Sequence, residues 1–276
     1  MQKRQYGFIL VKQIFKFFFL SLYLYFMAFS VNATQGDSFQ SDSPLIAAAS
    51  SIKFALDDVV QAFTIDTGLT VNVSYGSSGN LVSQIKHGAP FELFLSADES
   101  YVLKLKQAHL IKGGGQVYAV GKLALVSPKT SNLRLDRSLM GVRALLKKQQ
   151  LERFAIANPK HAPYGERAQA LLKRLELWNS IYPHLVLGEN VSQAAQFVLT
   201  GAVQGGIVAL SLAIRPQFAE KVNYFVLPKD LYPPLKQSMA LLNDAGTTAT
   251  LFYQYVLSPK AQSIFQQYGF ASEESL

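Results

Sequence analysis

Short apolar runs with strand character alternate with longer segments of helical periodicity along most of the chain, and this alternation is the strongest constraint on its fold. A sequence that changes period in this way is typical of α/β layers around mainly parallel sheets. The expected strands are 45–50, 69–75, 91–97, 123–129, 153–159, 205–211, 222–228 and 237–242, and the main helical segments are 51–68, 79–90, 99–111, 138–151, 164–178 and 191–201.

The start of the chain has the layout of a secretory signal. Basic residues lie within positions 3–16, an uncharged apolar run spans residues 17–31, and small residues precede a cleavage site after Ala33. We expect residues 1–33 to be a signal peptide that is removed on export to the periplasm. The alternative is a retained membrane anchor, because the uncharged run is close to the roughly 20 residues that span a bilayer.

Much of the apparent basicity belongs to this signal. The full chain has 26 Lys and Arg against 18 Asp and Glu, a net charge of +8. Residues 1–33 hold four of the basic side chains and none of the acidic ones, so the mature chain has 22 against 18, or +4. It has no dense basic stripe with interleaved aromatic residues, so nucleic acid is not an expected partner. The lack of cysteine suits an exported chain that folds on its core alone.

The C-terminal segment 248–270 is amphipathic and too apolar to extend into solvent. We expect it to pack on an earlier part of the fold, after the late strand at 237–242. A chain that returns to its first half favours two lobes over one continuous sheet.

Two neighbouring strand-to-helix corners carry serines. The runs "AAASS" and "SYGSSGN" place Ser50 and Ser78 where helical amides are free and where the helix dipole favours negative charge. Gly76 and Gly79 leave the backbone there open to close approach. Capping alone is the alternative for either serine.

Two similar corners follow in the second half of the chain. In "AIANPKHAPYGERAQALL" a Pro-marked loop leads into a helix at Pro163 and Tyr164, and in "GENVSQAAQFVL" another helix opens at Asn190 or Val191. Four helix beginnings could therefore converge on one small anion. Such a site would bind through hydroxyls and amides, with no obligatory Lys or Arg.

Four blocks of sequence resemble the periplasmic molybdate-binding proteins (ModA family) that serve ABC importers. They are "LIAAASSIKFALDDV", "SYGSSGNLVSQIKHGAPFELFLSAD", "ANPKHAPYGERAQALL" and the ending "SPKAQSIFQQYGF". The similarity runs in the expected order from about Leu45 to Phe270.

The resemblance implies a type II periplasmic-binding fold, in which two α/β lobes enclose a tetrahedral oxyanion and are joined by a hinge. Lobe I would comprise residues 34–124 and 237–276, and lobe II residues 125–236. The hinge crossings would lie near Gly121 to Val126 and near Pro228 to Met239.

The resemblance also implies the ligand-binding residues. Ser50 and Ser78 match hydroxyl and amide donors, while Tyr164 and Val191 match positions that give backbone amides. One departure concerns the strand "GGIVALS", where many members supply a tyrosine hydroxyl and this chain has Ala209. The hydroxyl of Tyr164 is a candidate replacement for that missing donor.

A site made only of donors suits a fully ionised dianion, because protonated phosphate brings a hydrogen that needs an acceptor. The family resemblance favours molybdate or tungstate, and sulfate or thiosulfate is the alternative. It also implies an ABC transporter permease as partner, a monomeric state, and no cofactor and no catalysis.

The histidines and the serine motif indicate neither a metal site nor a hydrolase. His87, His109, His161 and His184 lack the spacing of a zinc site, so no metal cation is expected, and a surface role is favoured for His161 over one at the cleft rim. A serine hydrolase is a rival class, although "GSSGN" is not the G-x-S-x-G nucleophile elbow.

Overall fold

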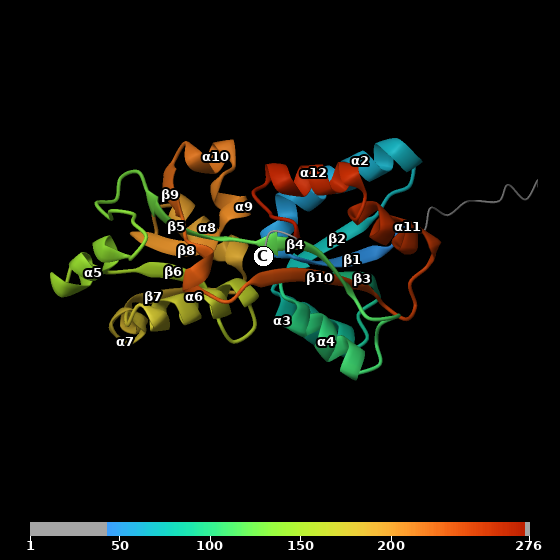
Figure 1. Ribbon diagram of the computed structural model, residues 1–276, viewed down its shortest axis with the longest axis horizontal. Helices are drawn as coiled ribbons and strands as arrows, with labels where there is room; N and C mark the ends of the chain where they lie inside the picture. Colours follow the sequence, from blue (N-terminus) through green and yellow to red (C-terminus); the bar gives the residue numbers. More distant parts are fainter. Residues whose placement is uncertain (1–42, 274–276) are drawn as a thin grey trace, which may run out of the picture. The chain divides into compact units, whose positions relative to one another are not determined.

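The computed structural model describes residues 43–273, and the expected signal peptide lies outside the described residues. The chain forms two five-stranded sheets (Figure 1). The first has the order β2-β1-β3-β10-β4, with β1 (Leu45–Ala49), β2 (Asn72–Gly76), β3 (Phe91–Ser96), β4 (Gln116–Gly121) and β10 (Leu235–Leu241). The second has the order β7-β6-β8-β5-β9, with β5 (Leu123–Pro128), β6 (Phe154–Ala157), β7 (Leu185–Gly188), β8 (Gly205–Ala209) and β9 (Val222–Val226).

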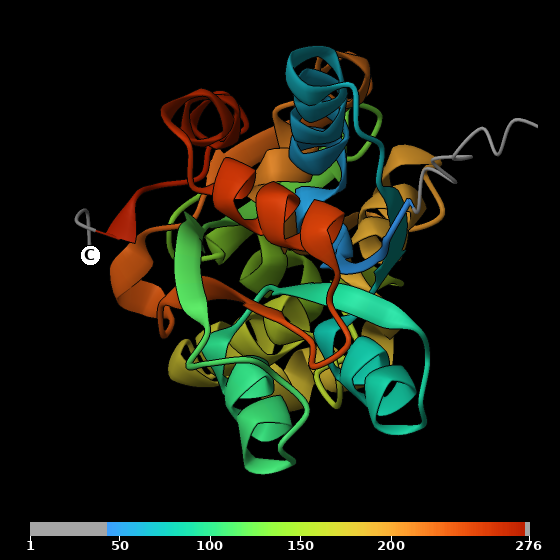
Figure 2. The ribbon, with the colours of Figure 1, turned by 90° about the vertical axis from the view of Figure 1, so that its right-hand side faces the viewer.

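Helices cover both faces of the first sheet (Figures 1 and 2), and we call this sheet with its helices lobe I. Strand β1 is buried on both faces, because Ile46 and Ala48 belong to one apolar cluster and Ala47 to another. The helices of lobe I are η1 (Ser50–Ile52), α2 (Lys53–Thr67), α3 (Ser78–Lys86), α4 (Glu99–Gln107), α11 (Thr247–Val256) and α12 (Pro259–Gln267).

The second sheet and its helices form lobe II. Helices α6 and α7 lie on one side of this sheet and α9 and α10 on the other (Figure 1). The elements are α5 (Met140–Lys147), α6 (Pro163–Arg174), α7 (Trp178–Ile181), η2 (Tyr182–His184), α8 (Val191–Leu199), α9 (Leu210–Ala213) and α10 (Pro216–Ala219). A short helix, η3 (Lys229–Leu231), follows β9.

The expectation of mainly parallel sheets is wrong in part. Strand β10 runs antiparallel to both β3 and β4, and β5 runs antiparallel to both β8 and β9. The remaining pairs, β1 with β2 and β3 and β6 with β7 and β8, are parallel. The antiparallel strands are those next to the passages between the sheets, where the chain arrives without an intervening crossover helix.

The chain passes from the first sheet to the second between Gly121 and Leu123, and it returns between Val226 and Leu235. The domain limits and the hinge role of these passages stay predictions. The packing of the C-terminal segment on an earlier part is confirmed, because the Phe252 ring lies edge-on to Phe63 of α2 with centroids 5.1 Å apart. Within residues 43–273, no helix combines the length and apolar character needed to cross a bilayer.

Candidate functional site

All four strand-to-helix corners singled out by the sequence surround one small cavity. The predicted site residues Ser50 and Ser78 line it from lobe I, and Tyr164 and Val191 line it from lobe II. Ala209 is fully buried and does not belong to the lining. The lining residues are Ala49, Ser50, Ser51, Gly76, Ser77, Ser78, Ala97, Ala162, Pro163, Tyr164 and Val191.

The cavity has the size of a site for one small ion. Its empty space, counted with its opening, is about 180 Å³. Cavities that take drug-sized ligands measure about 300–1,000 Å³. With the lobes in this arrangement, the cavity does not admit a sugar or a peptide.

The lining residues are all uncharged, so any ligand must be held by hydroxyl groups, N–H groups and helix dipoles. The positive ends of helix dipoles favour an anion over a cation at such a place. Among the described residues, no three His, Cys, Asp or Glu side chains gather as the ligands of a metal ion would.

Helix α8 begins with a free amide at Val191. The side-chain oxygen of Asn190 accepts hydrogen bonds from the Ser192 and Gln193 amides, at 3.0 and 3.1 Å. The Ala194 amide donates to the Asn190 carbonyl at 3.2 Å. Of the amides in this first turn, only that of Val191 has no partner within residues 43–273. The cap of α8 therefore leaves one donor for the cavity.

Helix α6 presents the Tyr164 amide for a different reason. Ala162 occupies the N-cap position and has no polar side chain with which to cap the helix. Pro163 follows and has no N–H, so the first amide of the helix is that of Tyr164. The part of the chain described here gives that amide no hydrogen-bond acceptor. The Tyr164 amide is therefore free, and its role as a donor to the ligand stays a prediction.

The capping alternative for Ser50 and Ser78 is not what the structure shows. The N-caps of η1 and α3 are Ala49 and Ser77, and neither makes a side-chain capping bond. The Ser78 hydroxyl oxygen instead accepts from the Ala97 amide at 3.0 Å, which leaves its own hydrogen free to donate. The Ser50 hydroxyl makes no hydrogen bond to any described residue.

Two neighbours of the cavity were not among the predicted site residues. Ser51 lines the cavity, and its buried hydroxyl has no hydrogen-bond partner among the described residues. His161 contacts a residue of the cavity lining, in place of the surface role that the sequence favours, with Nδ1 3.0 Å from the Ser77 hydroxyl. Its Nε2 is 3.6 Å from a carboxylate oxygen of Glu189. The serine doublet at 50–51 is the only sequence signal for Ser51. For His161 the signal is its place just before the corner at Pro163, which is the reason for the cleft-rim alternative.

The Tyr164 hydroxyl has a hydrogen-bond partner of its own. It accepts a hydrogen bond from the Gln237 side chain at 3.1 Å, and Gln237 belongs to β10 of lobe I. The Ser51 hydroxyl lies close enough to favour ionisation of Tyr164, but its geometry is not that of a hydrogen bond. The role of this hydroxyl as a replacement for the donor missing at Ala209 stays a prediction.

We expect the buried Tyr164 to make the protein less stable in alkali. Burial, together with nearby Tyr232, holds the pKa of Tyr164 well above its ordinary value of 10.0. In the unfolded chain this hydroxyl loses its proton near pH 10, so its contribution to folding is complete below that pH and is lost as the pH rises further. Urea unfolding at pH 8 and 11 should show a smaller decline in Tyr164→Phe than in wild type, by up to about 1.4 kcal/mol per pH unit. Equal declines would contradict this expectation.

Two α/β lobes with a small cavity at four helix beginnings define a two-lobed solute-binding protein, as the sequence predicts. A family model described as bacterial extracellular solute-binding protein matches residues 44–271. The molybdate-binding protein ModA of Rhodobacter capsulatus is 35% identical over 232 residues, which cover 83% of this chain and 88% of that protein. Its counterpart in Azotobacter vinelandii is 36% identical over 228 residues, covering 82% and 88%.

A solved structure extends the comparison to the fold. The periplasmic molybdate-binding protein of Azotobacter vinelandii aligns with a TM-score of 0.75 at 30% identity, over 83% of this chain and 99% of that chain. The chain therefore belongs to the bacterial extracellular solute-binding proteins and, within them, to the ModA family of molybdate-binding proteins. The resemblance carried by the four sequence blocks is confirmed.

Proposed function

We propose that this protein captures molybdate or tungstate in the periplasm and delivers it to the membrane permease of an ABC importer. The observation that carries the proposal is the uncharged cavity between four helix beginnings, where two serine hydroxyls and the amides of Tyr164 and Val191 are free to donate. The names of the relatives support molybdate as the anion. The protein would act as a monomer, without nucleic acid.

The lack of charge in the lining supports a fully ionised anion. It contains no carboxylate, so the proton of hydrogen phosphate would find only neutral serine hydroxyls as side-chain acceptors, which bind it less strongly than a carboxylate does. Sulfate satisfies the same donors, and only the fit of the anion to the cavity separates it from molybdate. The fit of the anion to the cavity is likewise what separates thiosulfate from molybdate.

Titration calorimetry with molybdate, tungstate, sulfate and phosphate tests the proposal. We expect tight binding of the first two and weak binding of the others. At 100 times the dissociation constant, a ligand stabilises the folded state by about 2.7 kcal/mol, which raises the Tm of a chain of this size by roughly 5–10 °C. Sodium chloride at equal ionic strength is the control. Sulfate binding as tight as that of molybdate, or no thermal shift with any of the four anions, would overturn the assignment.

Export and transport are tested in cells. Mass spectrometry of the protein recovered from the periplasm should show Thr34 as the first residue. Deletion of the gene should raise the molybdate concentration that a strain needs for growth. An unchanged requirement would contradict the transport role while leaving the binding result intact.

A serine hydrolase is the competing class, because Ser77, His161 and Glu189 have the residue types of a hydrolytic triad and contact one another. The cavity beside Ser77 is too small for an ester substrate, and the Glu189 side chain is 58% exposed. We therefore propose a contact between the lobes and no catalytic role for this cluster. A serine-reactive phosphonate should label neither Ser77 nor Ser78, and covalent labelling of either would overturn this view.

A further inference from the structure

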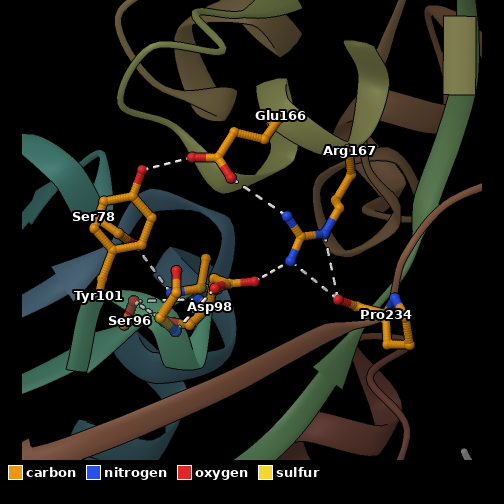
Figure 3. Close-up of polar contacts among 9 residues, drawn as sticks. Ser78, Ser96, Asp98, Tyr101, Glu166, Arg167 and Pro234 are labelled. Atoms are coloured by element: carbon orange, nitrogen blue, oxygen red, sulfur yellow. Dashed lines mark hydrogen bonds and ion pairs between the residues drawn. The ribbon is translucent and has the colours of Figure 1, made fainter. Parts of the chain in front are cut away.

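A second polar cluster joins the lobes beside the cavity (Figure 3). Arg167 of α6, in lobe II, forms an ion pair with Asp98, which is the N-cap of α4 in lobe I. The two side chains are only 16% and 6% exposed. Next to this pair, the Tyr101 hydroxyl of α4 donates to the Glu166 carboxylate of α6 at 2.7 Å. We call Asp98, Tyr101, Glu166 and Arg167 the clasp.

Further hydrogen bonds fix the position of Asp98 in lobe I and of Arg167 in lobe II. The Ser96 hydroxyl bonds the backbone of Asp98, at 2.7 Å to its carbonyl oxygen and 3.1 Å to its amide. On the other side, Arg167 donates to the Pro234 carbonyl at 3.3 Å, just before β10 begins, and to Glu166 at 3.3 Å. The guanidinium therefore contacts a carboxylate of lobe I, a carboxylate of lobe II and the returning chain at once.

The clasp is directly linked to the ligand donors of the cavity. Asp98 follows Ala97, whose amide donates to the Ser78 hydroxyl oxygen. Arg167 lies three residues after Tyr164, close to one helical turn along α6. A rigid-body movement of the lobes that separates Arg167 from Asp98 therefore also separates the Tyr164 amide from the Ser78 hydroxyl.

We propose that Arg167 is a positioning residue, which holds the beginning of α6 against lobe I while the anion is enclosed and thereby slows its release. The inference rests on the proposed function. With the lobes apart, Asp98 and Arg167 would each be hydrated, and closure withdraws both from most of that water. Without Arg167, closure would bury the Asp98 carboxylate with no cation beside it. Burial of this unpaired carboxylate raises the free energy of the closed state and not of the open state. The closed complex should therefore open, and release its ligand, faster.

Stopped-flow release of molybdate from the full mature protein tests the clasp. We expect Arg167→Ala to release molybdate about 10- to 100-fold faster than wild type, with a nearly unchanged association rate. Arg167→Lys should recover part of the loss, because it keeps the charge but not the fork of donors. Arg174→Ala, on an exposed position at the end of the same helix, is the matched control and should release at the wild-type rate.

A double-mutant cycle separates positioning from general destabilisation. Asp98→Asn keeps a side chain able to cap α4 and removes the charge that Arg167 pairs with. If the clasp acts as a pair, the double variant Asp98→Asn with Arg167→Ala should release molybdate more slowly than Arg167→Ala alone, because no unpaired carboxylate is then buried on closure. Fully additive effects, or a wild-type release rate in Arg167→Ala, would overturn the inference. Failure of wild type to bind molybdate would instead overturn the proposed function.

Discussion

Replacement of Gly79 by alanine should prevent the lobes from closing and weaken molybdate binding by at least about 100-fold. Gly79 lies on α3 of lobe I, and its amide donates to the His161 carbonyl of lobe II at 2.9 Å. A Cβ atom at Gly79 would lie 2.7 Å from that carbonyl oxygen and 2.8 Å from the His161 Cβ. Backbone atoms cannot move aside as a flexible side chain does, so the methyl group must hold the lobes apart.

The same substitution should not destabilise the anion-free protein. Gly79 has an ordinary backbone conformation on a helix, where alanine is favoured over glycine by about 1 kcal/mol. Calorimetry should therefore show lost binding together with an unchanged or higher Tm without ligand. Gly114→Ala is the matched control, because the nearest atom to its Cβ would be the Lys106 Nζ at 4.0 Å. Wild-type affinity in Gly79→Ala would mean that the anion binds without this approach of the lobes.

The four cavity corners could be predicted from the sequence because each is a local feature. A strand pattern that stops at Ser50 or Ser78 and continues as a helix places a free amide and a hydroxyl at the same end of a sheet, whatever the rest of the fold does. The Pro163 entry to α6 is local in the same sense. Topology then brings these corners together. The sequence allowed the four helix beginnings to converge on one anion, and the family resemblance implied that they do.

The strands missed by sequence reasoning are those with weak local signals. Strand β4 follows the glycines at 113–115, which mask its beginning, and β7 has only four residues, Leu185–Gly188. Strand direction could not be predicted either, because the period-2 pattern of β10 is the same whether the strand runs parallel or antiparallel to β3. The antiparallel direction of β10 is shown by its pairing with β3 in the folded sheet, where Met239 lies opposite Leu95.

The contacts between the lobes were not predictable for a related reason. Asp98 and Arg167 are 69 positions apart, and nothing in the local pattern of either marks it as a partner of the other. From the sequence, His161 is likewise a histidine in a loop, and only the folded structure shows its contact with Ser77 of lobe I. The sequence could thus indicate the candidate donors at the cavity, whereas the contacts between the lobes required the structure.

The last prediction concerns Ser78, the donor with the most complete set of contacts. Its side chain is fully buried, and its hydroxyl oxygen accepts from the Ala97 amide, so its hydrogen is free to donate. Ser78→Ala should weaken molybdate binding by about 10- to 150-fold, because a hydrogen bond to a charged group contributes about 1.5–3 kcal/mol. Titration calorimetry measures this loss, and Ser83→Ala on the exposed face of α3 is the matched control.

Comparison with Ser50→Ala separates the two duties of the Ser78 hydroxyl. Removal of Ser50 should cost affinity alone, since its hydroxyl bonds no described residue. Removal of the Ser78 hydroxyl also leaves the buried Ala97 amide without a hydrogen-bond acceptor. This loss should lower the free energy of unfolding of the anion-free protein by about 1–3 kcal/mol, measured in urea. Because Ala97 precedes the clasp residue Asp98, this variant should also release molybdate faster than Ser50→Ala does. Equal stability of the two variants would show that the Ala97 amide finds another acceptor, and wild-type affinity in both would remove the serines from the site.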